Sequence, residues 1–426
     1  MSAAGTVRAP TTDLSLGEID LGDLEVWMRP DRDGIFAKLR AEAPITFHRE
    51  PIPQDERIPQ GPGFWALTRY ADVMQASRDP ETFHSAPSST IGDIPPEIAE
   101  WLGSMINMDA PKHTKLRLIV NRGFTRRRVN QIQDSVREQA REIIERVAPL
   151  GECDFVSEIA AALPLQVICD MLGIPRSDTQ RIFELTNTIL GVGDPEYVST
   201  LEELMAAGME LFQYGLDLAQ KRLDEPSDDI ATALLHAQID DEEGQHSLTP
   251  SELGSFFLLL VVAGNETTRN AISHGMLALT QHPDQRAIWL RDFEAISPTA
   301  VEEIVRWATP VIHFRRTASV DTRIGDQEIR AGEKVVLFYN SANRDEAAFD
   351  DPYRFDVHRS PNEHVGFGAG GPHFCLGANL ARREITVMFE ELFRRLPDIE
   401  TSGEPDLLQS AFIHGIKRMP CRFTAR

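Results

Sequence analysis

The chain contains little cysteine and no long apolar run. Its four cysteines stand at positions 153, 169, 375 and 421 with no paired spacing, so they point away from a disulfide framework and fit a reduced, cytoplasmic compartment. The longest apolar run in the middle of the chain, Phe256–Ala263, is far shorter than the roughly 20 residues that a membrane span needs. The N-terminus is acidic and has no apolar segment, so we expect neither a signal peptide nor a membrane anchor.

Positive charge is also scarce. Lys and Arg number 43 against 66 Asp and Glu, a net charge of −23, which argues against affinity for nucleic acid or for an anionic membrane. With 426 residues, 42% of them hydrophobic, the chain exceeds the usual size of a single core, so two domains or one large lobed domain is expected. Residues 1–22 have no helical or strand period and are predicted to form a surface tail.

The middle of the chain has the pattern of helices. Apolar residues recur at three- and four-residue spacing over 129–147, 155–172, 179–190, 201–223 and 230–238. A further helix, over 251–281, would be about 45 Å long at 1.5 Å per residue, and its apolar centre must be buried. β-type runs lie near 45–70, 313–340 and 400–426, and the runs at 45–48 and 64–68 are expected to pair as a hairpin. The sequence thus predicts a mainly α fold with a smaller β-rich part.

A glycine-rich segment, His364–Arg382, surrounds Cys375. Its glycines leave the backbone free of Cβ atoms, as a large flat ligand requires if it is to approach the main chain closely. A helix predicted over 376–396 places Cys375 at a helix N-terminus, where free N–H groups favour the thiolate that binds a soft transition metal. A solitary Cys held in this way suits the axial position of a haem iron. The alternative, one more buried thiol, leaves the surrounding glycines unexplained.

The residues Phe367, Gly371, His373, Cys375 and Gly377 resemble the cysteine-loop signature of the cytochrome P450 family. The resemblance extends from about residue 20 to the end and implies a single domain over 23–426, in which haem b is held by Cys375 beneath a long central helix. Phe367 stands one residue further from the cysteine than in the usual motif, which is typical of a bacterial subgroup acting on sterol side chains and methyl-branched lipids. The resemblance implies a monooxygenase that inserts one oxygen atom from O2 into a C–H bond.

The stretch Ala263–Thr268 interrupts the apolar centre of the 251–281 helix with a glycine, an acid and hydroxyl groups. Burying such groups costs several kcal/mol unless they are satisfied or used. Gly264 weakens the helix locally and Thr267 can bond to a carbonyl one turn earlier, which together open a groove that suits O2. The stretch resembles the oxygen-activating motif of the family, which implies that Thr267 and Glu266 deliver protons. The alternative is a kinked core helix with satisfied polar groups.

Two other classes of protein are alternative interpretations of this pattern. A haem sensor or electron-transfer protein without oxygenase activity would have the haem-anchoring residues but no need for an acid and a hydroxyl in an apolar helix. An all-helical protein without a cofactor would be colourless when purified.

Glu303 and Arg306 lie one turn apart on a predicted helix and can pair. They resemble the Glu-x-x-Arg motif of the family, which with Arg359 implies a buried structural network near the cysteine loop. A surface ion pair of little energetic value is the alternative.

The propionates of a haem need cations. The resemblance implies that four basic residues bind them, namely His113, Arg117, Arg316 and His373, although most basic residues are simply solvated. The segment Lys112–Arg128 carries seven basic residues and no Asp or Glu, which predicts a docking patch for an acidic electron donor, with a solvated helix as the alternative. No flavin or iron–sulfur module is recognisable, so we expect electrons from NAD(P)H through separate proteins, a ferredoxin reductase and a ferredoxin.

In its closest form the resemblance is to bacterial enzymes that hydroxylate terminal methyl groups of branched lipids and sterol side chains. It implies apolar substrate contacts from Ile94, Val262, Ala263, Val311 and Phe412. A lipid-like chain fits such a lining, and core packing is the alternative use of these side chains. The sequence therefore predicts ω-hydroxylation of a methyl-branched lipid or a sterol side chain, with a terpenoid or polyketide as the alternative substrate.

Overall fold

The computed structural model describes residues 8–53, 60–93, 104–121, 124, 133–197, 200–241 and 244–426. The chain forms two compact units. The first contains Met1–Asp93, Leu277–Phe374 and Gln409–His414, and the second contains Ile94–Met276, Cys375–Leu408 and Gly415–Arg426. The fold is mainly α with a smaller β part, as predicted. The assignment of residues 23–426 to a single domain stays a prediction.

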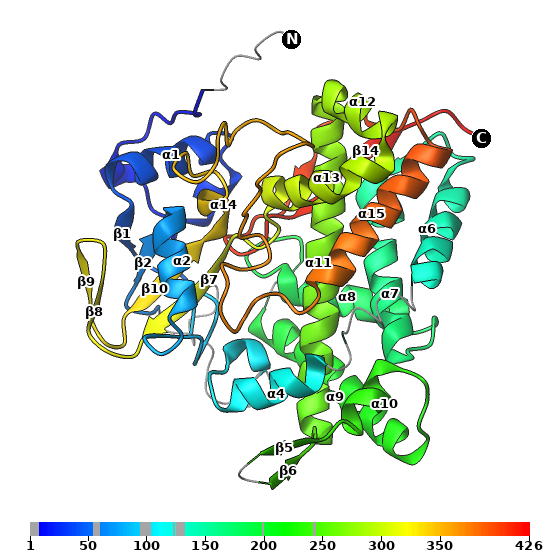
Figure 1. Ribbon diagram of the computed structural model, residues 1–426, viewed down its shortest axis with the longest axis horizontal. Coiled ribbons are helices and arrows are strands. Elements are labelled where there is room, and N and C mark those ends of the chain that lie inside the picture. The colour runs from blue at the N-terminus through cyan, green and yellow to red at the C-terminus, as the bar shows by residue number, and fades with distance from the viewer. Residues whose placement is uncertain are drawn as a thin grey trace. The chain divides into compact units, whose positions relative to one another are not determined.

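The first unit is built on a five-stranded sheet in the order β1-β2-β10-β7-β3, whose strands β2, β10 and β7 lie side by side in Figure 1. The predicted hairpin is confirmed, because β1 (Ile45–His48) and β2 (Phe64–Leu67) pair antiparallel with Ile45 opposite Leu67. The other strands are β3 (Phe83–His84), β7 (His313–Ala318) and β10 (Lys334–Phe338). Two short strands outside this sheet, β8 (Thr322–Ile324) and β9 (Gln327–Ile329), pair with each other.

Strand β10 is buried on both faces, and its alternating side chains enter two hydrophobic clusters. Val336 and Phe338 belong to one cluster, while Val335 and Leu337 belong to the other. The helices of this unit are α1 (Arg32–Glu42), α2 (Tyr70–Arg78), α12 (Pro283–Arg291), α13 (Phe293–Ala308) and α14 (Tyr339–Ala342). Helix α1 supplies Ile35, Phe36 and Leu39 to the first cluster.

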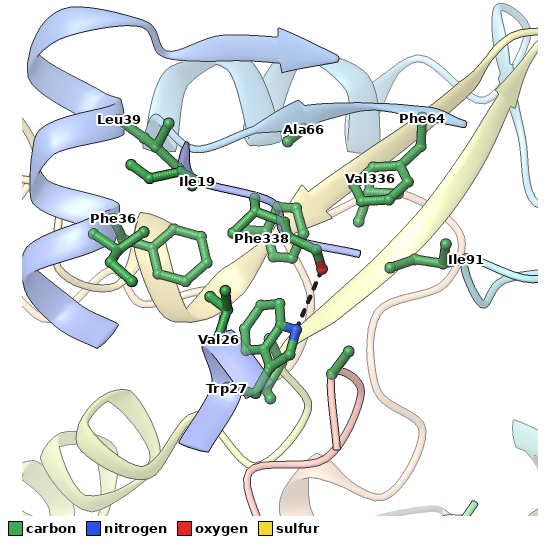
Figure 2. Close-up of a cluster of buried hydrophobic side chains, with 14 residues drawn as sticks. Ile19, Val26, Trp27, Phe36, Leu39, Phe64, Ala66, Ile91, Val336 and Phe338 are labelled. Carbon is green, nitrogen blue, oxygen red and sulfur yellow. Dashed lines mark hydrogen bonds between the residues drawn. The ribbon is translucent and has the colours of Figure 1, made fainter. Parts of the chain in front are cut away.

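The same cluster corrects the expectation of a surface tail over residues 1–22. Within the described part of that segment, Ile19 and Leu21 are buried, and Figure 2 shows Ile19 among the cluster side chains. The indole N–H of Trp27 donates to the carbonyl oxygen of Leu21 at 3.3 Å. The segment is anchored because its two apolar residues alternate with acidic ones, which places both apolar side chains on the core side of an extended chain. The short 3₁₀ turns Leu16–Glu18 and Leu24–Met28 flank it.

The second unit is helical. It contains α4 (Lys112–Asn121), α6 (Gln133–Val147), α7 (Ala162–Leu172), α8 (Thr179–Leu190), α9 (Leu201–Asp224), α10 (Ile230–Leu235) and α15 (Ala378–Arg395). Helices α6, α7 and α15 pack together (Figure 1). The helix predicted over 155–172 is divided, because a π-helical turn at Val156–Ala160 precedes α7. The helix predicted over 230–238 ends earlier, at Leu235.

Helix α11 (Pro250–Gln281) agrees closely with its prediction and is about 48 Å long at 1.5 Å per residue. It starts at a capping interaction in which the N–H of Glu252 donates to the Thr249 hydroxyl at 3.2 Å, while the Glu252 carboxylate accepts from Thr249. Its residues up to Met276 belong to the second unit and the rest to the first.

The β part of the second unit is small. Strands β11 (Glu400–Thr401), β14 (Pro420–Arg422) and β4 (Glu152–Asp154) form a three-stranded sheet, and β12 (Asp406–Leu407) pairs with β13 (Ile416–Arg418). A further hairpin joins β5 (Ile239–Asp241) to β6 (Gly244–His246). Among the described residues, no helix is both long and apolar enough to cross a lipid bilayer.

Candidate functional site

Helix α11 exposes a short stripe in the middle of an otherwise buried surface. Phe257, Leu258, Leu260 and Val261 are buried as predicted, but Ala263 is exposed and Val262, Gly264 and Thr267 are partly exposed. The helix continues without interruption through this stretch. The accessible stripe therefore consists of small or apolar side chains and one hydroxyl, and it carries no charge.

Thr267 makes the back-bond expected from the sequence. Its hydroxyl donates to the carbonyl oxygen of Ala263 at 2.7 Å, one turn earlier. Because the O–H is used in this bond, the lone pairs of Oγ1 are left to accept from a donor on the accessible side of the helix.

Gly264 has a second role that the sequence did not suggest. A Cβ atom at this position would lie 2.8 Å from the Cδ1 atom of Ile168 on α7. The glycine therefore permits a close approach of α7 to α11, in addition to lowering helix propensity.

Glu266 is buried and bound within α11. Its Oε1 atom accepts from the guanidinium of Arg269 and from the amide of Asn270 at 3.0 Å. Arg269 also donates to the side chain of Asn187 on α8 at 3.0 Å, and the Asn270 side chain accepts from the N–H of Ile416 on β13 at 3.0 Å. The carboxylate is thus an ion-paired group, and its Oε2 atom has no hydrogen-bond partner in the part of the chain that the structure describes.

Arg269, Asn270 and Asn187 are functional candidates that sequence reasoning missed. The spacing of Glu266 and Arg269 is the same as that of Glu303 and Arg306, so the pair was readable from the sequence. The amide partners come from other elements, and a pattern along one helix does not reveal them.

Cys375 stands immediately before α15, whose N-cap residue is Gly377, so the predicted helix start at 376 is two residues early. The Sγ atom accepts from the N–H groups of Gly377 and Ala378, as the helix-terminus argument predicts. The side chain is exposed, but the surrounding protein desolvates the thiol and raises its pKa. The two N–H groups and the guanidinium groups of Arg117 and Arg382 act to lower this pKa, but they do not outweigh the desolvation. The helix terminus alone therefore does not supply a thiolate, and a bound metal ion would have to provide the remaining stabilisation.

The predicted propionate ligands of the second unit lie on α4. His113 is buried and Arg117 is partly exposed, four residues apart on one face of the helix. Burial lowers the pKa of the Arg117 guanidinium, while its attraction to the Cys375 sulfur acts in the opposite direction. Arg117 and Cys375, 258 positions apart in the sequence, are therefore close enough to interact electrostatically.

Glu384 is a further buried acid that the sequence did not single out. It lies on α15, desolvation raises its pKa to about 8, and a hydrogen bond with Thr268 of α11 opposes this shift. Its Oε1 atom has no partner within the described residues. The carboxyl group is consequently protonated near neutral pH.

In the first unit, the loop before the cysteine depends on its glycines for its backbone shape. Gly368, Gly370 and Gly371 have φ angles of +99°, +83° and +81°, which residues with a Cβ atom rarely adopt. A Cβ atom on Gly371 would lie 2.3 Å from the carbonyl oxygen of Ser77, and one on Gly366 would lie 2.7 Å from Val305. Packing and backbone conformation within this unit therefore explain why several of these positions are glycine. The sequence pattern had suggested the close approach of a flat ligand instead.

The expected network of Glu303, Arg306 and Arg359 is present; Glu303 and Arg306 are buried and Arg359 is partly exposed. Arg306 donates to both carboxylate oxygens of Glu303 at 2.7 and 2.8 Å, and Arg359 donates to both at 3.1 and 3.2 Å. Burial acts to raise the pKa of Glu303, but the two arginines outweigh it and lower that pKa. A surface ion pair is thereby excluded.

The network is joined to the cysteine loop through Asn343. Arg306 donates to the carbonyl oxygen of Asn343 at 2.8 Å, and the side chain of Asn343 accepts from the N–H of Val365 at 2.8 Å. Two hydrogen bonds therefore connect the ion network to the start of the loop.

The remaining predicted residues of the first unit occupy three places. Arg316 is buried on β7 and donates to the carbonyl oxygen of Arg315 at 2.8 Å. His373 and Phe367 are partly exposed in the loop, where the Phe367 ring lies 5.8 Å from that of His364. Val311 and Phe412 lie on adjoining segments, because Val311 forms a β-bridge with Ile413.

Some predicted features fall outside the described residues. Ile94 is one of them, as are Arg122 and the arginines 126–128 of the basic run. Of the described part of that run, Lys112 is exposed, while Lys115 and Arg117 are partly exposed.

Comparison with known proteins agrees with this arrangement. A model of the family Cytochrome P450 matches residues 297–409. The chain is 50% identical to the methyl-branched lipid omega-hydroxylase of Mycobacterium tuberculosis, with 96% of each chain covered. It is 44% identical to the steroid C26-monooxygenase of Rhodococcus jostii, over 90% of this chain and 80% of that one.

The chain belongs to the cytochrome P450 family. Among solved structures, a cytochrome P450 of Mycobacterium marinum in complex with pseudoionone is similar with a TM-score of 0.88 and 44% identity, covering 98% of this chain and 100% of that one. The protein is therefore a cytochrome P450 monooxygenase, and membership of the family implies a haem, a hydrophobic substrate and redox partners.

The residues of the second unit fit a haem. Cys375 is accessible at a helix terminus and interacts electrostatically with Arg117. Apart from its chain neighbours, no atom of the described residues would lie within 4 Å of a Cβ atom on Gly377, so this part of the backbone beside the sulfur leaves room for a flat ligand. In the first unit, Arg316 and His373 are the basic residues that remain candidates for the propionates.

Proposed function

We propose that this cytochrome P450 hydroxylates a terminal methyl group of a methyl-branched lipid or of a sterol side chain. The observation that carries the proposal is the accessible stripe on α11, where Val262, Ala263 and Thr267 present small or apolar groups and no charge. Such a surface accepts a hydrocarbon chain and offers no partner for an ionised group. The names of the relatives from Mycobacterium tuberculosis and Rhodococcus jostii support the same substrate class.

In this proposal, Cys375 holds the haem iron, while His113, Arg117, Arg316 and His373 bind the propionates. The haem, when bound, supplies the redox chemistry that activates O2. The side chains of Val262, Ala263, Val311 and Phe412 contact the substrate, and Ile94, outside the described residues, is proposed for the same role.

Protons are supplied through two residues of α11. Thr267 accepts a hydrogen bond at Oγ1 from a water molecule on the accessible side, because its own O–H is donated to Ala263. Glu266 passes protons through Oε2, since Oε1 is already bound by Arg269 and Asn270. Gly264 permits the close approach of Ile168 on α7 to this part of the helix.

Electrons come from NAD(P)H through a ferredoxin reductase and a ferredoxin, which binds the basic residues between Lys112 and Arg128. The enzyme works in the cytoplasm, which agrees with four cysteines that are all free in the structure.

The substrate is tested by titrating the purified protein with branched fatty alcohols, branched fatty acids and sterols while the spin state of the haem is monitored. We expect a shift to high spin with the branched lipids or sterols, and a terminal alcohol as the product in a reconstituted system. Tighter binding of terpenoids or polyketides, with hydroxylation at an internal carbon, would contradict the proposal. Replacement Cys375→Ser should remove the red-shifted Soret band of the reduced carbonyl complex, and an unchanged band would exclude Cys375 as the ligand.

A further inference from the structure

Two cysteines of the second unit face each other across a pair of antiparallel strands. Cys153 on β4 is directly opposite Cys421 on β14, and their Sγ atoms are 3.5 Å apart. The two residues are 268 positions apart in the sequence, so the spacing of the cysteines could not reveal the pair. Both thiols are free in the structure.

The geometry is close to that of a disulfide. Residues directly opposite each other in antiparallel strands have Cα atoms roughly 4.5–5.5 Å apart, which is within the range that disulfides span. An S–S bond is about 2.05 Å long, so the sulfurs must approach by about 1.5 Å, a movement that side-chain rotation can provide. The backbone of the two strands already has the required separation.

The surroundings make the two thiols unequal. Cys421 is buried, at 1% exposure, while Cys153 is partly exposed. A hydrogen bond from Cys421 lowers the pKa of the Cys153 thiol, and the nearby Arg146 guanidinium lowers it further. Desolvation and the carboxylates of Glu158 and Asp154 act in the opposite direction but do not outweigh the hydrogen bond. The same hydrogen bond and burial raise the pKa of Cys421. Cys153 is therefore the thiol that ionises first and is reached from solvent, and Cys421 is the buried partner beside it.

We propose that Cys153 and Cys421 form a redox modification site that is converted to a disulfide by hydrogen peroxide. The Cys153 thiolate attacks one oxygen of the peroxide, and with one proton this yields a sulfenic acid and water. The sulfur of Cys421 then attacks the sulfenic sulfur, forms the S–S bond and releases a second water. One peroxide is thus reduced to two water molecules, and the two thiols together lose two electrons.

The oxidant is available where the enzyme works, because a monooxygenase that consumes electrons without forming product can release hydrogen peroxide. The disulfide would tie the C-terminal strand β14 to β4, which directly precedes the π-helical turn and α7. Cross-linking of positions so distant in sequence restricts the unfolded chain strongly. Oxidation should therefore raise the unfolding temperature by about 5 °C.

The alternative is that the two thiols are only small packed side chains.

The test begins with the reduced holoenzyme, which is exposed to hydrogen peroxide without denaturant. The remaining free thiols are alkylated, and the peptides are analysed by mass spectrometry without reduction. We expect one cross-linked peptide joining Cys153 to Cys421. Cys169→Ser is the matched control, because Cys169 is also buried, and burial raises the pKa of its thiol to about 12; that variant should still form the cross-link.

Replacement Cys153→Ser should abolish the cross-link and the rise in unfolding temperature. If this variant folds poorly, Cys153→Ala gives a second test with the same expected result. Oxidation of Cys153 to a sulfinic acid without a cross-link, a cross-link that forms only in denaturant, or a cross-link between two molecules would each overturn the proposal.

Discussion

Two helices of this protein carry a buried Glu–Arg pair at the same spacing, and the pairs differ in how fully their atoms are bonded. On α13, both carboxylate oxygens of Glu303 accept bonds from Arg306 and Arg359, and further bonds come from Asn362 and the N–H of Asp356. On α11, all the bonds to Glu266 converge on Oε1. Within the described residues, Glu266 Oε2 and Arg269 Nε have no partner.

The difference shows what each pair is suited to do. A buried polar network whose members are all satisfied rigidifies the structure around it, and that of Glu303 reaches the cysteine loop through Asn343. A buried carboxylate with one unpartnered oxygen is costly to maintain, and it is retained more readily where that oxygen has a chemical use. The predictions below separate these two roles, beginning with the largest effect.

The strongest effect is expected for Glu303→Gln. The substitution leaves the buried Arg306 and the partly exposed Arg359 without their negative partner, which should lower the free energy of unfolding by about 3–5 kcal/mol. Chemical denaturation of the holoenzyme measures this loss. Glu294→Gln is the matched control on the same helix, since Glu294 is exposed, and it should change stability by less than about 0.5 kcal/mol.

The same carboxylate should give the stability a dependence on pH. The pKa of Glu303 is lowered in the folded protein, so its contribution is fully present above the unfolded-state pKa of about 4.3 and is lost as the pH falls through the folded-state pKa. Glu303→Gln should therefore flatten the acid side of the stability curve. If the stability of the variant falls equally steeply at acid pH, other carboxylates are responsible for the pH dependence.

Glu266→Gln should show the opposite balance of effects. Only Arg269 loses its negative partner, whereas Glu303→Gln takes that partner from two arginines, so stability should fall by less. The Oε2 atom, however, is replaced by a group that cannot relay a proton. We expect product formation to slow about 100-fold, with haem content and substrate affinity unchanged. Arg269→Lys retains the positive charge and tests whether the position of the carboxylate also matters. If the Glu266→Gln variant has normal activity, the Glu266–Arg269 pair has only a structural role.

Glu384 is a third buried acid, and its substitution is expected to have a smaller effect on stability. The pKa of Glu384 is raised to about 8 by desolvation, so the folded state binds more protons than the unfolded state between about pH 4.3 and pH 8. Its presence should make the protein less stable as the pH rises through that range. Glu384→Gln, which resembles the neutral acid, should remove this decline when unfolding is measured between pH 6 and pH 9, and an unchanged decline would contradict the raised pKa.

The sequence was informative where a local pattern determines the structure. The β-type runs at 45–48 and 64–68 predicted the hairpin, and the helix predicted over 251–281 agrees with α11 (Pro250–Gln281) within one residue. The Glu303–Arg306 pair followed from helix periodicity and from the family resemblance.

The sequence was less informative where distant segments determine the environment of a residue. The close contact that a side chain at position 264 would make is with Ile168 on α7, and the desolvation of Glu384 depends on the packing of α15 against the rest of its unit. The partners of Arg269 and Asn270 come from α8 and β13. None of these contacts has a signature within one helix, because each depends on which elements pack together.

Thr267 is the residue of the α11 stripe whose proposed role in the chemistry can be tested most directly. The measurement is the ratio of hydroxylated product to NAD(P)H oxidised in a reconstituted system, for Thr267→Ala, Thr267→Ser and Thr268→Ala. Thr268 is the matched control, because it is the neighbouring hydroxyl but is buried against Glu384. The account predicts that Thr267→Ala still takes up haem, substrate and electrons but diverts much of the flux to hydrogen peroxide, while Thr267→Ser and Thr268→Ala remain coupled. A Thr267→Ala enzyme as well coupled as the parent would contradict it.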